Sequence, residues 1–472
     1  MTGRTLLRSF AVAASLALSA CATMPPPVPI NRPSAAPEAG GILPPGMALE
    51  GDAIALVFSG GGARAAAFSY GVLRGLGAMP ARAGGSLLDR VALLSGVSGG
   101  SISAAWFGLH GAAGLDGFRA AYLDRDWQSE LHTSAYSPRN WLALSQGGMN
   151  SAGGLTDWLD AQVFRGARMA DLRRRGRPAV LISATDMANR TPFVFAAEAF
   201  SALCSDLDSV LVADAVGASM AVPLLFRPVV VQAFPAACTT PMPDWTARNA
   251  TRRAAPRILR SLARAYRSYR DPRQMAYVHL FDGGVTDNFG LSGMTAARLS
   301  EDSPYGPLEP RDVVRLRSIT FVLVDSGQSH ADDWALKLAG PNGEEVGKAS
   351  IGAAMDSSAR AYYDAFHLAM RAWEREMRDY RCALPAAEVK RLRGTLAGWD
   401  CAAIALTVDF ITFADLPPAQ RDELAAVDTQ VSLKPSEVDR LIAGGETAAR
   451  VNQTLKALTG DPEPAQKVSA LD

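Results

Sequence analysis

The stretch 90–111, RVALLSGVSGGSISAAWFGLHG, contains a short apolar run, a turn of glycine and serine, and a second mainly apolar segment. The first run predicts a buried strand because it is short and ends in a glycine turn, and the residues from Ser101 onward predict a helix. Residues 96–100 match G-x-S-x-G, the pattern of a sharp strand-to-helix turn that lifts a serine hydroxyl into a cleft. Ser98 is therefore a candidate nucleophile, although glycine and serine are also common in ordinary turns.

Strands and helices alternate along most of the chain. Residues 53–79 repeat the order of strand, glycine turn and helix. Further strands are predicted at 179–187, 226–232, 275–284 and 318–327. This alternation predicts an α/β domain with a largely parallel sheet, whose functional groups lie on loops beyond the strand ends. After about Gly327 the pattern is mainly helical around one strand near 403–413. We therefore assign 51–330 to the α/β domain and 331–472 to a mainly helical C-terminal extension.

The N-terminus has the features of an export signal. Residues 1–20 carry two arginines, then an apolar run too short to span a bilayer, then small residues. LSAC at 18–21 resembles the lipobox of bacterial lipoproteins, which implies that Cys21 becomes the lipidated first residue of the mature chain. The proline-rich segment 21–50 then predicts an extended tether without a fold of its own. The expected location is the bacterial cell envelope, as a membrane-anchored lipoprotein of the outer membrane that faces the periplasm.

Composition excludes some classes of partner and ligand. The chain has 47 basic and 47 acidic residues, so no net charge attracts nucleic acid. Four cysteines besides Cys21 make an even set for an exported protein and allow three disulfide pairings; proximity in sequence favours Cys204 with Cys238 and Cys382 with Cys401. Their spacing does not match a zinc site, and we predict no metal site.

A glycine loop lies between the strand and the helix predicted within 53–79, at FSGGGARAA, residues 58–66. A dinucleotide site would need an acidic residue at the end of the next strand, but that strand ends in Ser95 and Gly96, and a P-loop would need G-K-[S/T]. Gly60, Gly61 and Gly62 instead present backbone N–H groups at a helix N-terminus, as an oxyanion hole requires. Arg64 either orients this loop or adds positive potential. No cofactor is expected.

The general base is harder to assign because the chain has five histidines. Ser98, Asp282 and His330 occur in the order of a serine–acid–histidine triad, which is one hypothesis. The other rests on Asp282 alone, which ends a predicted strand in HLFDGGVTDNFGL, so that its carboxylate is displayed at the same kind of strand end as Ser98. Asp287 and Asn288, further along that loop, either position it or bond local backbone.

Three motifs in order resemble the patatin-like phospholipase family. They are G-G-G-x-R at 60–64, G-x-S-x-G at 96–100 and D-G-G at 282–284, and VGASMAVPLLFRPVVV at 216–231 is similar to a further segment of that family. The resemblance implies a three-layer α/β/α catalytic domain across 51–330 and a lipid acyl hydrolase of phospholipase A or lysophospholipase type. Membrane lipids or lysolipids would be its substrates.

The same resemblance implies a serine–aspartate dyad with no histidine. Ser98 would carry the acyl group as an acyl-enzyme and Asp282 would act as its base. Aspartate is a weak base, so the oxyanion donors must compensate. One position departs from the family pattern, because Ala65 stands where a further glycine is usual. A different class of function stays open: a catalytically silent envelope lipoprotein that binds lipid or protein.

A basic segment spans residues 248–273. Arg257, Arg260, Arg264 and Arg267 recur at helical spacing, with apolar residues near another face. Two interpretations follow. The helix lies on anionic lipid headgroups near the active site, or it is a solvated helix whose arginines pair with acidic neighbours.

Overall fold

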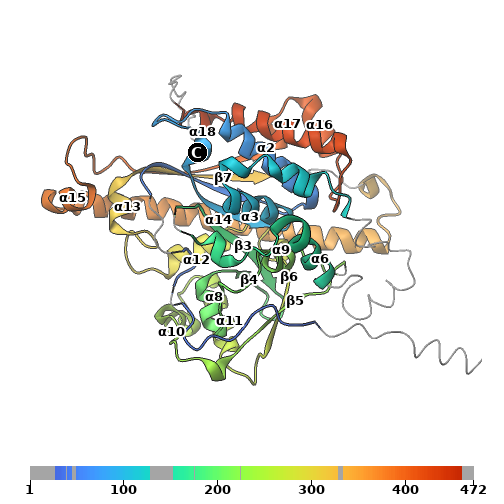
Figure 1. Ribbon diagram of the computed structural model, residues 1–472, viewed down its shortest axis with the longest axis horizontal. Coiled ribbons are helices and arrows are strands. Elements are labelled where there is room, and N and C mark those ends of the chain that lie inside the picture. The colour runs from blue at the N-terminus through green and yellow to red at the C-terminus, as the bar shows by residue number, and fades with distance from the viewer. Residues whose placement is uncertain are drawn as a thin grey trace, which may run out of the picture.

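A single mixed sheet forms the centre of the protein (Figure 1). The computed structural model describes residues 27–38, 40–44, 49–127, 152–174, 176–223, 225–327 and 333–459. The strands are β1 (Gly51–Phe58), β2 (Val91–Val97), β3 (Ala179–Asp186), β4 (Thr191–Val194), β5 (Val229–Gln232), β6 (Tyr277–Asp282), β7 (Leu316–Asp325) and β8 (Ala405–Thr412). Their order is β5-β6-β3-β2-β1-β7-β8, and β4 pairs with β3.

Most neighbouring strands run parallel, as the sequence predicts. The five strands β3, β2, β1, β7 and β8 form a continuous parallel block, whereas β4, β5 and β6 add antiparallel pairs. The strands of the block read as apolar runs because both faces of the sheet are covered; in β1 every side chain from Ala53 to Phe58 is buried. The sheet therefore supplies the rigid frame on which the loops of the site are placed.

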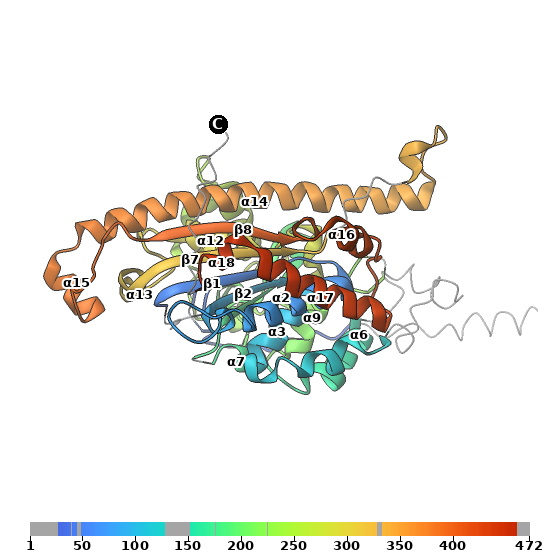
Figure 2. The same cartoon turned by 90° about the horizontal axis from the view of Figure 1, so that it is seen from above.

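Helices cover both faces of the sheet, which makes three layers (Figure 2). They are α2 (Gly62–Gly77), α3 (Gly99–His110), α6 (Ala152–Leu159), α7 (Met169–Leu172), α8 (Ala197–Leu203), α9 (Val212–Ser219), α10 (Asp244–Thr251), α11 (Arg257–Tyr269), α12 (Ser292–Ser300), α13 (Pro310–Arg315), α14 (Gly343–Ala383), α15 (Ala386–Arg393), α16 (Pro418–Ala425), α17 (Pro435–Val451) and α18 (Gln453–Lys456). Helices α2, α3 and α17 lie on one face, and α12 and α14 lie on the other. The predicted α/β/α architecture is confirmed.

The C-terminal region is mainly helical, but it is part of the sheet domain rather than an appendage. Strand β8 pairs in parallel with β7 from Ser318 opposite Ala405 to Asp325 opposite Thr412. Helix α17 packs on α2, the helix that follows the glycine loop. A boundary at residue 330 therefore divides neighbouring strands of one sheet, and the two regions share a core.

The contact between α2 and α17 is close enough to require glycine. A Cβ atom added to Gly445 would lie 2.3 Å from the Phe68 carbonyl oxygen, and one added to Gly71 would lie 2.2 Å from the Ile442 carbonyl oxygen. Both distances are shorter than the closest approach of a carbon and an oxygen atom that are not bonded. The two backbones therefore approach directly, and α17 fixes the position of α2.

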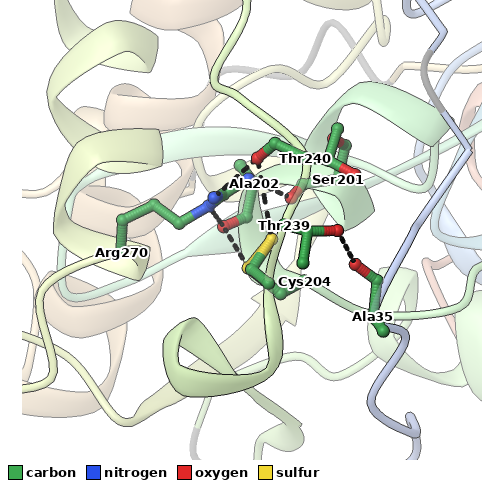
Figure 3. Close-up of a disulfide and its surroundings, with 8 residues drawn as sticks. Ala35, Ser201, Ala202, Cys204, Thr239, Thr240 and Arg270 are labelled. Atoms are coloured by element: carbon green, nitrogen blue, oxygen red, sulfur yellow. Dashed lines mark hydrogen bonds between the residues drawn. A yellow bond between two sulfur atoms is a disulfide. The ribbon is translucent and has the colours of Figure 1, made fainter.

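The proline-rich segment 21–50 differs from the prediction of a tether without fold, because the part that the structure describes is bound to the domain. The Ile30 N–H donates to the Val230 carbonyl at 3.0 Å, and the Thr239 N–H donates to the Ala35 carbonyl at 3.1 Å. The Thr239 hydroxyl also donates to the Ala35 carbonyl, as Figure 3 shows. The predicted signal peptide 1–20 and Cys21 lie outside the described residues. Among the described helices, none is long and apolar enough to cross a membrane.

Two disulfides join the pairs that proximity in sequence favours. Cys204 and Cys238 are bonded with their Cα atoms 5.2 Å apart, and Cys382 and Cys401 with theirs 4.9 Å apart. The first lies beside the bound N-terminal segment (Figure 3). The second ties the end of α14 to the segment that leads into β8.

Alanine at two helical glycines should change stability in opposite directions. We expect Gly445→Ala to lower the free energy of unfolding by about 1–3 kcal/mol, because the new methyl group overlaps the α2 backbone. Gly352→Ala, in α14, meets no atom within 4 Å and should raise it by about 0.5–1 kcal/mol through helix propensity. Urea denaturation of both variants measures the difference; equal effects would contradict the close packing of α17 on α2.

Candidate active site

The site forms where two strands of opposite direction end beside the same stretch of β3. Val97, the last residue of β2, pairs with Ser183, and Asp282, the last residue of β6, pairs with Ala184. Strand β6 runs antiparallel to β3 and overlaps only its last residues, so the carboxyl end of β6 meets the carboxyl end of β2. The residues that follow these strands, at the serine turn and the D-G-G turn, are therefore brought together.

Ser98 occupies a strained turn between β2 and α3. Its backbone has φ 49°, in the left-handed region that non-glycine residues rarely adopt, as a nucleophile elbow requires. The Ser98 N–H donates to the Ser219 hydroxyl at 2.8 Å, and that hydroxyl donates to the Ser183 carbonyl at 2.6 Å. Ser219 lies within the segment 216–231 singled out in the sequence, but local pattern did not indicate that it holds the elbow.

Ser98 and Asp282 are in contact. The Ser98 side chain lies near enough to the Asp282 carboxylate to lower its pKa, and the Gly284 N–H donates to Asp282 Oδ1 at 2.8 Å. Both side chains are buried, with 7% and 5% of their surface exposed. Burial raises the pKa of Asp282 to about 6, although the neighbouring Ser98 side chain and the Gly284 N–H both act to lower it. The carboxylate is thus a stronger base than an exposed aspartate.

The glycine loop lies directly against the serine turn. A Cβ atom added to Gly99 would lie 1.9 Å from the Gly62 carbonyl oxygen, so the two backbones touch. Gly61 and Gly62 have φ values of 143° and 60°, which favour glycine. Within the described residues their N–H groups have no protein acceptor, whereas the Gly60 N–H donates to the Asn288 carbonyl at 3.1 Å. Of the three predicted oxyanion donors, Gly60 is therefore already occupied.

Arg64 braces the loop rather than adding a free charge beside it. Its side chain is buried, and Nη1 donates to the Val427 carbonyl at 2.8 Å. Burial lowers the pKa of Arg64 to about 10, while the nearby carboxylates of Asp325 and Asp428 act in the opposite direction. Of the two predicted roles of Arg64, this geometry favours the orientation of the loop. Ala65 is buried in the first turns of α2, and its N–H donates to the Gly61 carbonyl at 3.3 Å.

The loop after Asp282 has its own supports. The Asp287 carboxylate accepts the Ser292 N–H at 2.6 Å and so caps the start of α12. Asn288 holds the glycine loop through its backbone carbonyl, as described above. The methyl group of Met355 would lie 2.8 Å from a Cβ atom added to Gly284, so α14 covers this turn. His330 lies outside the described residues, and among those described no group of three or more His, Cys, Asp or Glu side chains could hold a metal ion.

A comparison with protein families identifies the domain. The family model described as patatin-like phospholipase matches residues 56–294, about half of the chain. The chain belongs to the patatin-like phospholipase family. The match begins in β1, contains the glycine loop, Ser98 and Asp282, and ends in α12. Family membership supports a lipid-hydrolysing esterase. No curated protein matches the chain.

The basic segment contains α11, in which Arg257, Arg264 and Arg267 are exposed and Arg260 is half-buried. Leu259, Leu262 and Tyr266 are buried, whereas Arg264 and Arg267 are exposed. We call the four arginines predicted at helical spacing the arginine face: Arg257, Arg260, Arg264 and Arg267. Among the described residues, none of the four has a carboxylate partner, although Arg248 pairs with Asp302 before the helix and Arg273 pairs with Asp271 after it. The interpretation that the face is neutralised by acidic neighbours does not fit this geometry.

The raised pKa of Asp282 predicts a pH-dependent stability difference. Below the unfolded pKa of about 4, Asp282 is protonated in the folded and in the unfolded protein, so burying it costs no charge. As pH rises from about 4 to about 6, the unfolded protein loses this proton before the folded one does, and the free energy of unfolding falls. Asp282→Asn removes the buried charge, so it should be more stable than the wild type at pH 8 by up to about 3 kcal/mol. The gain should fall to about half at pH 5.

Urea denaturation at the two pH values provides the measurement. The control is Asp364→Asn on the exposed side of α14, which relieves no buried charge and should show no such dependence. A gain at pH 8 no larger than at pH 5 would contradict the cost of burying the Asp282 carboxylate.

Proposed function

We propose that the protein is a lipid acyl hydrolase of phospholipase A or lysophospholipase type that works through a dyad of Ser98 and Asp282. The observation that supports it best is the proximity of the Ser98 side chain to the buried Asp282 carboxylate, whose pKa is raised to about 6. A general base is most effective when its pKa lies near the working pH. The raised pKa compensates in part for the weakness of aspartate as a base.

In the first half of the reaction, Ser98 Oγ attacks the ester carbonyl carbon and Asp282 takes the hydroxyl proton. The carbonyl oxygen becomes an oxyanion, which the N–H groups of Gly61 and Gly62 would stabilise. The bond from the carbonyl carbon to the alcohol oxygen then breaks, and Asp282 returns its proton to that oxygen. A lysolipid or a glycerophosphodiester leaves, and the acyl group stays on Ser98.

In the second half, water attacks the acyl-enzyme. Asp282 takes a proton from the water as its oxygen bonds to the acyl carbon, and the same two N–H groups hold the oxyanion again. The bond to Ser98 Oγ breaks, Ser98 recovers its proton from Asp282, and a fatty acid leaves. No histidine takes part, in contrast to the hypothesis of a triad with His330.

The dyad predicts how substitutions and pH change the rate of hydrolysis. We expect Ser98→Ala to lower the release of fatty acid from phosphatidylglycerol, phosphatidylethanolamine and lysophosphatidylcholine by more than about 1000-fold, and Asp282→Asn by about 100- to 10,000-fold. Because only the ionised carboxylate accepts a proton, kcat/KM of the wild type should rise with pH to a plateau, with its midpoint near 6.

His330→Ala is the control for this dyad and should keep activity within about threefold, whereas its inactivity would favour the triad. A folded wild type that hydrolyses none of the lipids and never reacts with a fluorophosphonate at Ser98 would instead support the silent lipoprotein.

We further propose that the mature protein is anchored through lipidated Cys21 and rests its arginine face on an anionic bilayer. Two features support this orientation. The arginine face lacks carboxylate partners among the described residues, and its exposed members Arg257, Arg264 and Arg267 are placed to meet phosphate groups. Arg270, at the end of α11, donates to the Ser201, Ala202 and Thr240 carbonyls next to the bound N-terminal segment (Figure 3). The anchor and the arginine face would therefore approach the membrane on neighbouring surfaces.

Vesicle binding tests the orientation without hydrolysis. With the unacylated chain that starts at residue 22, Arg264→Gln/Arg267→Gln should weaken binding to phosphatidylglycerol vesicles about 30-fold, given about 1 kcal/mol for each arginine near the surface. Arg371→Gln/Arg375→Gln on α14 removes the same charge elsewhere and should have little effect. Equal losses for the two pairs, or equal binding to neutral phosphatidylcholine vesicles, would contradict the proposal.

A further inference from the structure

The conformation of the glycine loop is not set by its own sequence. Gly61 and Gly62 adopt φ values of 143° and 60°, and glycine moves between such conformations at little cost. The N–H groups at the start of α2 also lack acceptors within the helix, as at every helix N-terminus. Contacts from outside the loop must therefore decide where these N–H groups point.

Two carbonyl groups from distant segments supply these contacts, one on each side. The Gly60 N–H donates to the Asn288 carbonyl at 3.1 Å, and the Ala63 N–H donates to the Gln430 carbonyl at 2.9 Å. Between them, the N–H groups of Gly61 and Gly62 have no acceptor among the described residues. The flanking bonds thus leave two adjacent donors free, in the number and place that an oxyanion needs.

The second carbonyl belongs to a short segment between α16 and α17, residues 427–430, which we call the strap. It lies close to the loop, because a Cβ atom added to Gly62 would be 2.5 Å from the Gln430 carbonyl oxygen. Arg64 fastens it at the other end by donating to the Val427 carbonyl at 2.8 Å. The carboxylate of Asp428, within the strap, also attracts the Arg64 guanidinium.

The strap is itself held on both sides. Val427 is buried, and its N–H donates to the Leu424 carbonyl at the end of α16. Beyond the strap, α17 packs on α2 through the contact at Gly445. The strap and α17 lie more than a hundred residues beyond the family match at 56–294, so the shared family pattern does not include them.

We propose that the strap 427–430, fastened by Arg64, positions the two free amides of the oxyanion hole. Arg64 and the strap are positioning elements, since they act through the Gly61 and Gly62 amides. The inference rests on the proposed hydrolase for its effect on catalysis. The position of the loop, however, is measurable without catalysis.

Loosening the strap tests this role in the full chain. Thr429→Gly/Gln430→Gly keeps the backbone carbonyl but frees its position, and Arg64→Met removes the fastening bond. We expect each to lower kcat for p-nitrophenyl butyrate about 100-fold with KM changed less than threefold, because the substrate still binds while the oxyanion donors are misplaced. The pH midpoint near 6 should stay, since Asp282 is untouched. Arg64→Lys should have a kcat at least tenfold higher than that of Arg64→Met.

The control is Arg393→Met, which removes exposed arginine-to-carbonyl bonds, to Thr395 and Ala397, next to α15 rather than at the site. It should leave kcat unchanged. Hydrogen exchange of the peptide 59–66 is the second readout, and its amides should exchange at least tenfold faster in the strap variants than in the wild type or the control. If Arg64→Met does not fold, the glycine variant carries the test alone.

The outcomes separate the strap from the proposed hydrolase. Unchanged exchange in the glycine variant, or unchanged kcat in an active protein, would overturn the role of the strap. A wild type that neither hydrolyses the ester nor reacts with a fluorophosphonate would contradict the proposed function, and exchange at 59–66 would then decide whether the strap holds the loop.

Discussion

The meeting of β2 and β6 at β3 is the constraint on which the site depends. A parallel sheet brings the carboxyl ends of its strands to one edge, but β6 is antiparallel to β3. Its last residue reaches the same edge only because the overlap is three residues long, from Ala184 to Asp186. Glycine at 283 makes this possible, since a Cβ atom there would lie 2.3 Å from the Ser183 carbonyl oxygen. The D-G-G motif is thus a packing requirement as well as the carrier of a carboxylate.

Much of this arrangement follows from local sequence. The strand ending at Val97, the elbow at Ser98 and the D-G-G turn each have a short pattern that sets the backbone nearby, and the structure places all three as the pattern indicates. The order of the motifs along the chain sufficed to indicate the family. Turns of this kind are predictable because the glycine, serine and aspartate residues that form them are the same residues that make up the sequence motif.

The remaining features depend on backbone groups far apart in the chain. The antiparallel direction of β6 and the short strand β4 follow from pairing with β3, which no local pattern reports. The Asn288 and Gln430 carbonyls that occupy the N–H groups of the glycine loop leave no trace in side-chain chemistry. The bound N-terminal segment is missed for the same reason, since proline-rich composition indicates an extended chain but does not say whether a surface accepts it. Sequence indicated the candidate catalytic groups, whereas the structure shows which contacts hold them.

The bound segment near Ile30 also limits how far the domain could stand from a membrane. If lipidated Cys21 is the anchor, the nine residues to Ile30 can span at most about 30 Å even when fully stretched. The edge of the sheet at β5, where Ile30 is bonded, would then stay within that distance of the bilayer. That length is comparable to the thickness of one membrane. The enzyme would accordingly work on lipids of the leaflet that holds it, and lipids of a distant membrane would have to be delivered to it.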